Sequence, residues 1–121
     1  MNFPQIPESV RLERLQPPTG KVKVVLDTDT YNEIDDQYAV VYALLSPEKI
    51  EVEALYAAPF FNHKSTSPAD GMEKSYDEII RLLSRLQTPH DGFVFKGSLE
   101  FLEGQNYQPQ ALPLRQLFSP P

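Results

Sequence analysis

The chain has 121 residues, 12 prolines, no cysteine, 40% hydrophobic residues and a formal net charge of -6. At this length it forms one domain at most, able to bury roughly two thirds of the surface that the unfolded chain exposes. The acidic balance argues against a nucleic-acid partner, which needs a basic face for phosphates, and the lack of cysteine excludes disulfides, thiolate metal sites and thiol nucleophiles.

Residues 1–20 combine prolines with charges and show no regular apolar period. We therefore expect an irregular N-terminal leader that ends at the turn signal Pro17-Pro18-Thr19-Gly20. The segment lacks the apolar stretch of a signal peptide, and no apolar run approaches the ~20 residues of a membrane span. These features favour a cytoplasmic protein with no membrane partner.

The next two segments predict a strand and a helix. Val22 to Leu26 is a short β-branched run, typical of a strand covered on both faces. From Glu33 to Leu45, apolar residues recur at the spacing of one helical face: Ile34, Tyr38, Val41, Tyr42 and Leu45. Other apolar residues surround this helix, so we expect it to be covered on most sides. Asn32 is the predicted N-cap, and Ser46-Pro47 ends the helix.

A second strand, a second helix and a third strand complete the predicted order. Ile50 to Ala58 has the composition of a strand. Ser67, Pro68 and Asp70 fit the N-cap, N1 and N3 positions of a helix. Its apolar face repeats as Met72, Tyr76, Ile79, Ile80, Leu83 and Leu86 before Thr88-Pro89. Phe93 to Phe95 is the third predicted strand, and the alternation of strands and helices favours a parallel sheet with right-handed crossovers.

Residues 98–121 are polar, contain prolines and predict no further helix or strand. A sheet of three strands is small for a doubly wound fold. We therefore expect the chain to be the N-terminal part of a larger α/β domain.

Four aspartates gather between the first predicted strand and its helix: Asp27, Asp29, Asp35 and Asp36. In open α/β sheets, ligands bind outside the carboxyl ends of the strands, where these side chains are expected. Two unit charges about 4 Å apart repel by about 4 kcal/mol at an effective dielectric of about 20, and a helix N-terminus returns only about 0.3 to 1 kcal/mol per carboxylate. A bound cation would remove the repulsion, and oxygen ligands alone suit Ca²⁺ or Mg²⁺. The alternative is a solvated loop and helix cap whose charges point apart.

Two known aspartate patterns fit these residues poorly. An EF-hand loop would need an acidic or amide side chain at position 31 followed by glycine, but the sequence has Tyr31 and no glycine there. The haloacid dehalogenase phosphatases begin with a strand and D-x-D-x-[TV]. Asp27 and Asp29 fit this pattern, whereas Tyr31 replaces the small Thr or Val. This family stays an alternative, with Mg²⁺ as cofactor and a phosphoaspartate at Asp27.

The stretch VVLDTDTYNEIDDQYAVVYALL resembles the N-terminal signature of the inosine-uridine-preferring nucleoside hydrolases, D-x-D-(P-G-x)-D-D-A after the first strand. Here TYNEI between Asp29 and Asp35 is two residues longer than the usual segment, and Gln37 replaces the alanine, as in a divergent branch. The resemblance continues through ALYAAPFFNHKSTSPADGMEKSYDEIIRLL and VFKG, to about residue 97. It implies that residues 21–121 are the N-terminal βαβαβ part of a Rossmann-like, mostly parallel sheet of the nucleoside hydrolase type.

The resemblance also implies roles for individual residues. In such hydrolases the aspartates hold a Ca²⁺ ion that binds a water and the sugar hydroxyls. Asp29 and Asp36 would be metal ligands, and Asp29 would also take the proton from the attacking water. Asp35 would bind the ribose hydroxyls, and Asp27 would be a supporting carboxylate at the metal. Asn62, in the loop after the second strand, would match the family's ribose-contacting asparagine.

The implied reaction is hydrolysis of the N-glycosidic bond of a ribonucleoside to ribose and free base. The family completes its Ca²⁺ shell with residues from later in the chain, so we expect these 121 residues alone to bind metal weakly and to turn over little. The phosphatase and a non-catalytic remnant that binds ribose or nucleosides stay as alternatives. The family often forms homo-oligomers, so the resemblance implies a possible homo-oligomer for a full-length chain.

Overall fold

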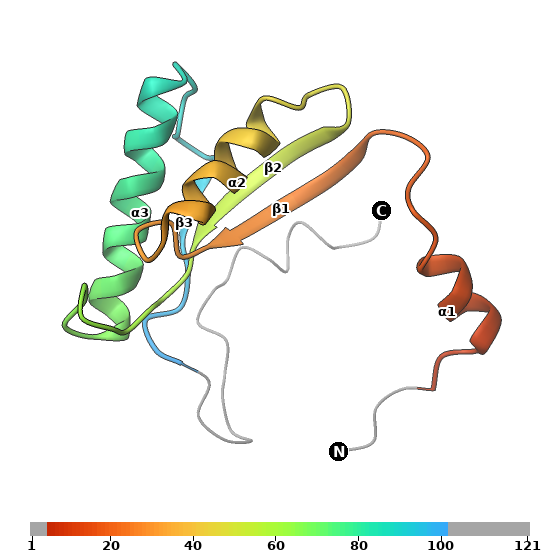
Figure 1. The fold of residues 1–121 in the computed structure, drawn as a ribbon, viewed down its shortest axis with the longest axis horizontal. Coiled ribbons are helices and arrows are strands. Elements are labelled where there is room, and N and C mark those ends of the chain that lie inside the picture. The colour runs from red at the N-terminus through yellow and green to blue at the C-terminus, as the bar shows by residue number, and fades with distance from the viewer. Residues whose placement is uncertain (1–4, 102–121) are drawn as a thin grey trace.

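The computed structural model describes residues 5–101 as an α/β fold with a three-stranded parallel sheet. The elements are α1 (Glu8–Arg14), β1 (Val22–Thr28), α2 (Ile34–Leu44), β2 (Ile50–Ala57), α3 (Pro68–Arg85) and β3 (Val94–Lys96) (Figure 1). From β1 onwards, the predicted order of strand, helix, strand, helix, strand is confirmed. No helix within the described range is long and apolar enough to cross a membrane.

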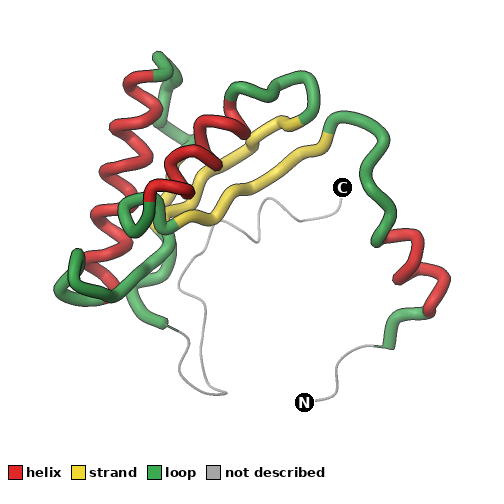
Figure 2. Tube along the Cα trace, in the orientation of Figure 1, coloured by secondary structure: helices red, strands yellow, loops and turns green. Residues whose placement is uncertain are grey.

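The sheet has the strand order β1-β2-β3, and both strand pairs are parallel. The register between β1 and β2 shifts once, since Val24 pairs with Val52 and Val25 with Ala54. Figure 2 shows the strands side by side with both longer helices on one side of them. Because the strands are parallel, their carboxyl ends meet at one edge, and the loops after β1 and β2 start from that edge.

The core lies between the sheet and the two helices α2 and α3, which contact each other and both contact β2. Leu55 and Ala57 of β2 and Val94 of β3 face the helices. Their buried partners are Val40 of α2 and, on α3, Met72, Ile79, Leu82 and Leu83. The packing of α2 in this core sets where the first turn of α2 lies relative to the end of β1.

The helix α2 faces the sheet with a different side from the predicted one. Val40 and Ala43 are its buried residues. The predicted inner face is instead largely exposed, with exposed fractions of 66% for Ile34, 70% for Tyr38, 74% for Tyr42 and 66% for Leu45. The physical reason is that α2 is apolar nearly all round, so its spacing does not determine which side meets the sheet. The expected cover on most sides is absent among residues 5–101.

The helix α3 follows its sequence signals closely. Ser67 caps it by accepting a hydrogen bond from the backbone N–H of Asp70 over 3.1 Å, and Pro68 is the first helical residue. The predicted inner residues Met72, Ile79 and Leu83 are fully buried, since the helix is amphipathic and has one clear apolar side.

The predicted irregular leader contains the short helix α1. Its seven residues bury no side chain, and Glu8 and Arg11 form an ion pair at 2.5 Å on its surface. Glu8 in the first turn and Arg14 in the last turn suit the helix dipole. An exposed helix needs no apolar stripe, so a search for apolar periods misses it. The expectation for residues 98–121 falls mostly outside the described residues.

Candidate functional site

Asp29 and Asp36 lie near each other where β1 passes into α2, close enough for the charge of Asp29 to act on Asp36. Asp29 is the first residue after β1, and Asp36 lies in the first turn of α2. Burial raises the pKa of Asp36, the hydrogen bond from Thr28 lowers it, and the charges of Asp29 and Asp35 together with hydrogen-bond contact with Asp29 raise it further. Two acidic groups that lie this near each other favour either a shared proton or a cation between them.

Thr28 positions Asp36 from the end of β1. Its hydroxyl donates to Oδ1 of Asp36 over 2.5 Å and lies 3.2 Å from the hydroxyl of Thr30. Both threonines are almost fully buried, with exposed fractions of 4% and 0%. The carboxylate of Asp36 is therefore held from the protein side through its Oδ1 atom.

Asn32 holds Asp29 through two contacts. The backbone N–H of Asn32 donates to the carbonyl of Asp29 over 2.6 Å, and its side-chain Nδ2 donates to Oδ2 of Asp29 over 2.8 Å. Asn32 was predicted to be the N-cap of α2, which is wrong, because Glu33 occupies that position without a side-chain capping bond. The amide of Asn32 is thus used for tertiary contacts instead of the helix start.

Asn62 joins this group from the loop after β2. Its Nδ2 donates to Oδ1 of Asn32 over 2.6 Å. Lys64 from the same loop donates through Nζ to the backbone carbonyl of Asn32. Asn62, predicted to contact ribose, is therefore linked to Asp29 through Asn32. We call Asp29, Asn32, Asp36 and Asn62 together the acidic site.

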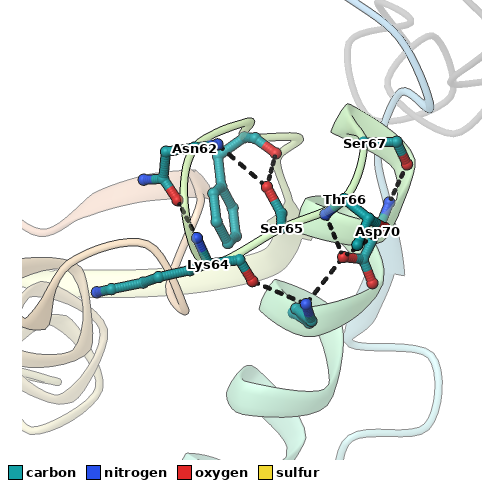
Figure 3. A network of polar contacts seen from close by, with 8 residues as sticks. Asn62, Lys64, Ser65, Thr66, Ser67 and Asp70 are labelled. Atoms are coloured by element: carbon teal, nitrogen blue, oxygen red, sulfur yellow. Dashed lines mark hydrogen bonds and ion pairs between the residues drawn. The ribbon is translucent and has the colours of Figure 1, made fainter.

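The loop that carries Asn62 is held by its own hydrogen bonds (Figure 3). Ser65 donates through Oγ to the carbonyl of Phe60 over 3.0 Å and accepts from the backbone N–H of Asn62 over 3.2 Å. The backbone N–H of Lys64 donates to Oδ1 of Asn62 over 2.9 Å. These bonds fix the direction of the Asn62 amide.

The start of α3 anchors the same loop. Oδ2 of Asp70 accepts from the backbone N–H of Thr66 over 2.7 Å and from Nζ of Lys74 over 2.8 Å, as Figure 3 shows for the labelled residues Thr66 and Asp70. The hydrogen bond from Lys74 is the largest cause that lowers the pKa of Asp70. Gly71 allows the close approach, since a Cβ atom there would lie 2.0 Å from the carbonyl oxygen of Phe60.

Asp27 lies on the other face of the sheet. It pairs with Tyr56 of β2, and strand alternation places it opposite Thr28 and the helices. There it lines a cavity of about 160 Å³ together with Tyr56, Pro59 and Gly97. Burial, and then the charge of Asp29, raises the pKa of Asp27. Asp27 therefore interacts with the acidic site through the charge of Asp29, although it lies on the face of the sheet away from the helices.

Asp35 is exposed in the first turn of α2 and acts on Asp36 through its charge. In the part of the chain that the structure describes, no three acidic or histidine side chains lie close enough to form a complete metal site. The groups present still have the chemistry that a hard cation prefers, since the neighbouring carboxylates of Asp29 and Asp36 offer oxygen atoms alone. They would supply part of a calcium shell of about six to eight ligands.

Three residues of this region were not predicted to act there: Thr28, Asn32 and Lys64. The alternation in Asp-Thr-Asp-Thr carried a signal for Thr28, because it places the hydroxyl on the helix side of β1. The contacts of Asn32 and Lys64 join loops 30 or more residues apart in sequence, and no local pattern indicates them.

Comparison of the chain with models of protein families, with curated proteins and with solved structures gave no match. A functional assignment therefore rests on the residues of the acidic site and on the motif that they form in the sequence.

Proposed function

We propose that this chain supplies the calcium- and ribose-binding part of an N-ribohydrolase, an enzyme that cleaves ribonucleosides to ribose and free base. The position of Asp29 and Asp36 at the carboxyl end of β1, where Thr28 holds Asp36 and Asn32 holds Asp29, carries the proposal. It is supported by the link from Asp29 through Asn32 to Asn62. The resemblance of the aspartate motif to the nucleoside hydrolases concerns these same aspartates.

Asp29 and Asp36 would hold the calcium ion, with Asp27 adding negative charge behind Asp29. A bound calcium ion would neutralise the facing carboxylates and lower the pKa of water at the site. Thr28 keeps Asp36 in place for this role through its hydrogen bond to Oδ1.

Asp29 is the proposed general base. Its Oδ2 accepts from Asn32 over 2.8 Å, so Oδ1 is the oxygen that would take the proton from an attacking water. The bond from Asn32 fixes the plane of this carboxylate. A base held in one orientation needs no reorganisation when the proton moves.

Ribose would bind between Asp35 and Asn62, both of which are exposed. A carboxylate accepts hydrogen bonds from sugar hydroxyls, and an amide both donates and accepts. Asn62 donates one Nδ2 hydrogen to Asn32 and keeps the second. Ionised carboxylates near the ring would stabilise the positive charge of an oxocarbenium-like transition state.

A phosphatase of the haloacid dehalogenase type is the second candidate, favoured by the position of Asp27 in a cavity of its own. Its nucleophile would be an ionised Asp27. The raised pKa of Asp27 opposes that role, because burial stabilises the uncharged acid. Trapping a phosphoaspartate at Asp27 with Mg²⁺ would favour this candidate over the hydrolase.

Thermal unfolding with ribose tests the proposal. We expect ribose to raise the melting temperature in the presence of Ca²⁺, and to have no effect with EDTA or in Asp36→Asn. Asp91→Asn is the matched control, since Asp91 is fully exposed at the amino end of β3, on the opposite edge of the sheet. Equal stabilisation by ribose with and without Ca²⁺ would contradict the proposal. In a longer protein that contains this chain, release of ribose from a nucleoside would separate an enzyme from a binding remnant.

A further inference from the structure

Thr30 is a fully buried polar residue beside the acidic site. Its exposed fraction is 0%, and it follows Asp29 in the loop between β1 and α2. Its hydroxyl lies 3.2 Å from the hydroxyl of Thr28, a residue that is itself 4% exposed. Among residues 5–101, the Thr30 hydroxyl has no other hydrogen-bond partner. Because water does not reach Thr30, the neighbours of this single bond decide its direction.

The hydroxyl of Thr28 has one hydrogen atom, and Asp36 accepts it. An ionised carboxylate can only accept hydrogen bonds, and Thr28 donates to Oδ1 of Asp36 over 2.5 Å. The oxygen of Thr28 is then left to accept from Thr30. Thr30 therefore donates to Thr28, and Thr28 donates to Asp36. We call these three residues the hydrogen-bond chain.

The hydrogen-bond chain has one favourable direction. If the Thr28 hydroxyl turned towards Thr30, Oδ1 of Asp36 would lose its donor. The hydrogen of Thr30 would also have no acceptor within the described part of the protein, and an unsatisfied buried polar group is costly. Bonds in such a chain also polarise and strengthen one another. Thr30 thus keeps the hydrogen of Thr28 directed at Asp36.

The burial of two hydroxyls at this place points to Asp36 rather than to packing. A buried hydroxyl costs free energy unless it is hydrogen-bonded. Valine would fill nearly the same space as either threonine without a polar atom to satisfy. What the two hydroxyls add is a directed bond to the carboxylate of Asp36.

We propose that Thr30 is a positioning residue: acting through Thr28, it holds the carboxylate of Asp36 in the orientation in which Asp36 binds a divalent cation. It contacts neither the ion nor the substrate. Partners that orient a metal ligand are worth about 10- to 100-fold in metal affinity. The role in metal binding rests on the proposed function, since it requires Asp36 to be a calcium ligand. The hydrogen-bond chain itself does not.

Carbon-13 NMR of the side-chain carboxyl groups tests the hydrogen-bond chain without calcium. At one neutral pH, Thr30→Val should shift the resonance of the Asp36 carboxyl carbon, although Thr28 stands between them. Thr30→Ser keeps a hydroxyl and should restore the wild-type resonance. The carboxyl of exposed Asp35 should not respond to either variant. An Asp36 resonance that stays in place in Thr30→Val overturns the hydrogen-bond chain. If Thr30→Val does not fold, Thr30→Ala makes the same comparison with a smaller side chain.

A titration of the same variants with Ca²⁺, followed by backbone amide shifts, tests the role in metal binding. We expect calcium affinity to fall by about 10- to 100-fold in Thr28→Val, which removes the direct bond to Asp36. Thr30→Val lies one bond further away and should lose about three- to tenfold, less than this range. Thr30→Ser should bind nearly like the wild type, because it keeps the donor.

Two control variants separate positioning from a general loss of stability. Thr88→Val removes a part-buried hydroxyl beyond the far end of α3, where it bonds the carbonyl of Leu86. Ile79→Val removes a methyl group from the core. Both should bind calcium like the wild type. If Ile79→Val weakens binding as much as Thr30→Val does, the effect of Thr30 is structural and its positioning role is overturned.

The two measurements distinguish failure of this inference from failure of the proposed function. A wild-type chain that binds no calcium contradicts the proposed function and the metal-binding role of Thr30 together, while a shifted Asp36 resonance in Thr30→Val would still establish the hydrogen-bond chain. A wild-type chain that binds calcium at Asp36, with unchanged affinity in Thr30→Val, overturns the role of Thr30 alone and leaves the proposed function standing.

Discussion

Asn32 joins the two loops of the acidic site, because it donates to Oδ2 of Asp29 over 2.8 Å and accepts from Nδ2 of Asn62 over 2.6 Å. One amide thus connects the end of β1 with the end of β2. Together with the bond from Lys64 to the backbone carbonyl of Asn32, this side chain sets the position of Asn62 relative to the carboxylates.

Asn32→Ala should destabilise the protein more than Asn62→Ala. Each variant removes two hydrogen bonds, and the bond between Asn32 and Asn62 is lost in both. The other bond lost in Asn32→Ala is a part-buried one to the carboxylate of Asp29, whereas the other bond lost in Asn62→Ala is an exposed one from the backbone N–H of Lys64. Each hydrogen bond contributes about 0.5 to 1.5 kcal/mol net, so Asn32→Ala should lower the free energy of unfolding by about 1 to 2 kcal/mol. Urea unfolding measures this, and a larger effect of Asn62→Ala would contradict the central place of Asn32.

Asp36→Asn should stabilise the calcium-free protein at neutral pH. The folded state raises the pKa of Asp36, mainly through burial, so its ionised form is less favourable in the folded than in the unfolded chain. The gain from the variant should be present above the folded pKa. It should shrink as the pH falls from the folded pKa towards the unfolded value of about 3.9, and it should be lost below that value, where the wild-type carboxyl is protonated in both states.

Denaturant unfolding at several pH values checks this dependence on Asp36. The amide oxygen of Asn can still accept from Thr28, so that bond is retained. Asp91→Asn should show no such gain, since its side chain is 99% exposed. A gain for Asp36→Asn that persists unchanged in acid would show that the ionisation of Asp36 is not its cause.

Gly71→Ala should displace the loop that carries Asn62. The added Cβ would lie 2.0 Å from the carbonyl oxygen of Phe60, a distance that requires the backbone to move. Overpacking of this kind costs about 1 to 3 kcal/mol. Gly20→Ala is the control, because nothing lies within 4 Å of its Cβ position. Thermal unfolding should separate the two variants, and equal melting temperatures would contradict the close contact.

Ser67→Ala should weaken the start of α3. Its hydroxyl accepts the backbone N–H of Asp70 over 3.1 Å, and loss of such a cap costs about 1 kcal/mol. Because Asp70 also holds Thr66, the loop before α3 should exchange its amide hydrogens faster. Hydrogen exchange at residues 62–66 measures this. Unchanged exchange there with a lower overall stability would separate the helix cap from the loop.

The sequence was informative where local signals decide the structure. The β-branched run of β1 and the Ser67-Pro68 start of α3 each act over a few neighbouring residues, and both appear in the structure as predicted. Asp29 and Asp36 could be brought together from the sequence because only residues 29–33 separate the end of β1 from the first turn of α2. Asp27 belongs to the same cluster in sequence, but strand alternation sets it on the other face.

Other features depend on contacts that no local pattern contains. The helix α2 has apolar residues on most sides, and its orientation is decided by how Val40 and Ala43 fit against β2. Asn32 has the residue type of a helix cap, yet its partner Asn62 comes from a loop 30 residues away. The free energy of that tertiary bond is comparable to that of a cap, so propensity alone does not predict which one forms.

A calcium titration followed by backbone amide chemical shifts tests the central claim most directly. If Asp29 and Asp36 bind the ion, the shifts should concentrate at Thr28, Asp29, Asn32 and Asp36, saturate at millimolar calcium and vanish in Asp29→Asn. Shifts of equal size at Glu48 and Asp91, unaffected by that substitution, would show diffuse attraction of cations to an acidic chain and would contradict a site between the two carboxylates.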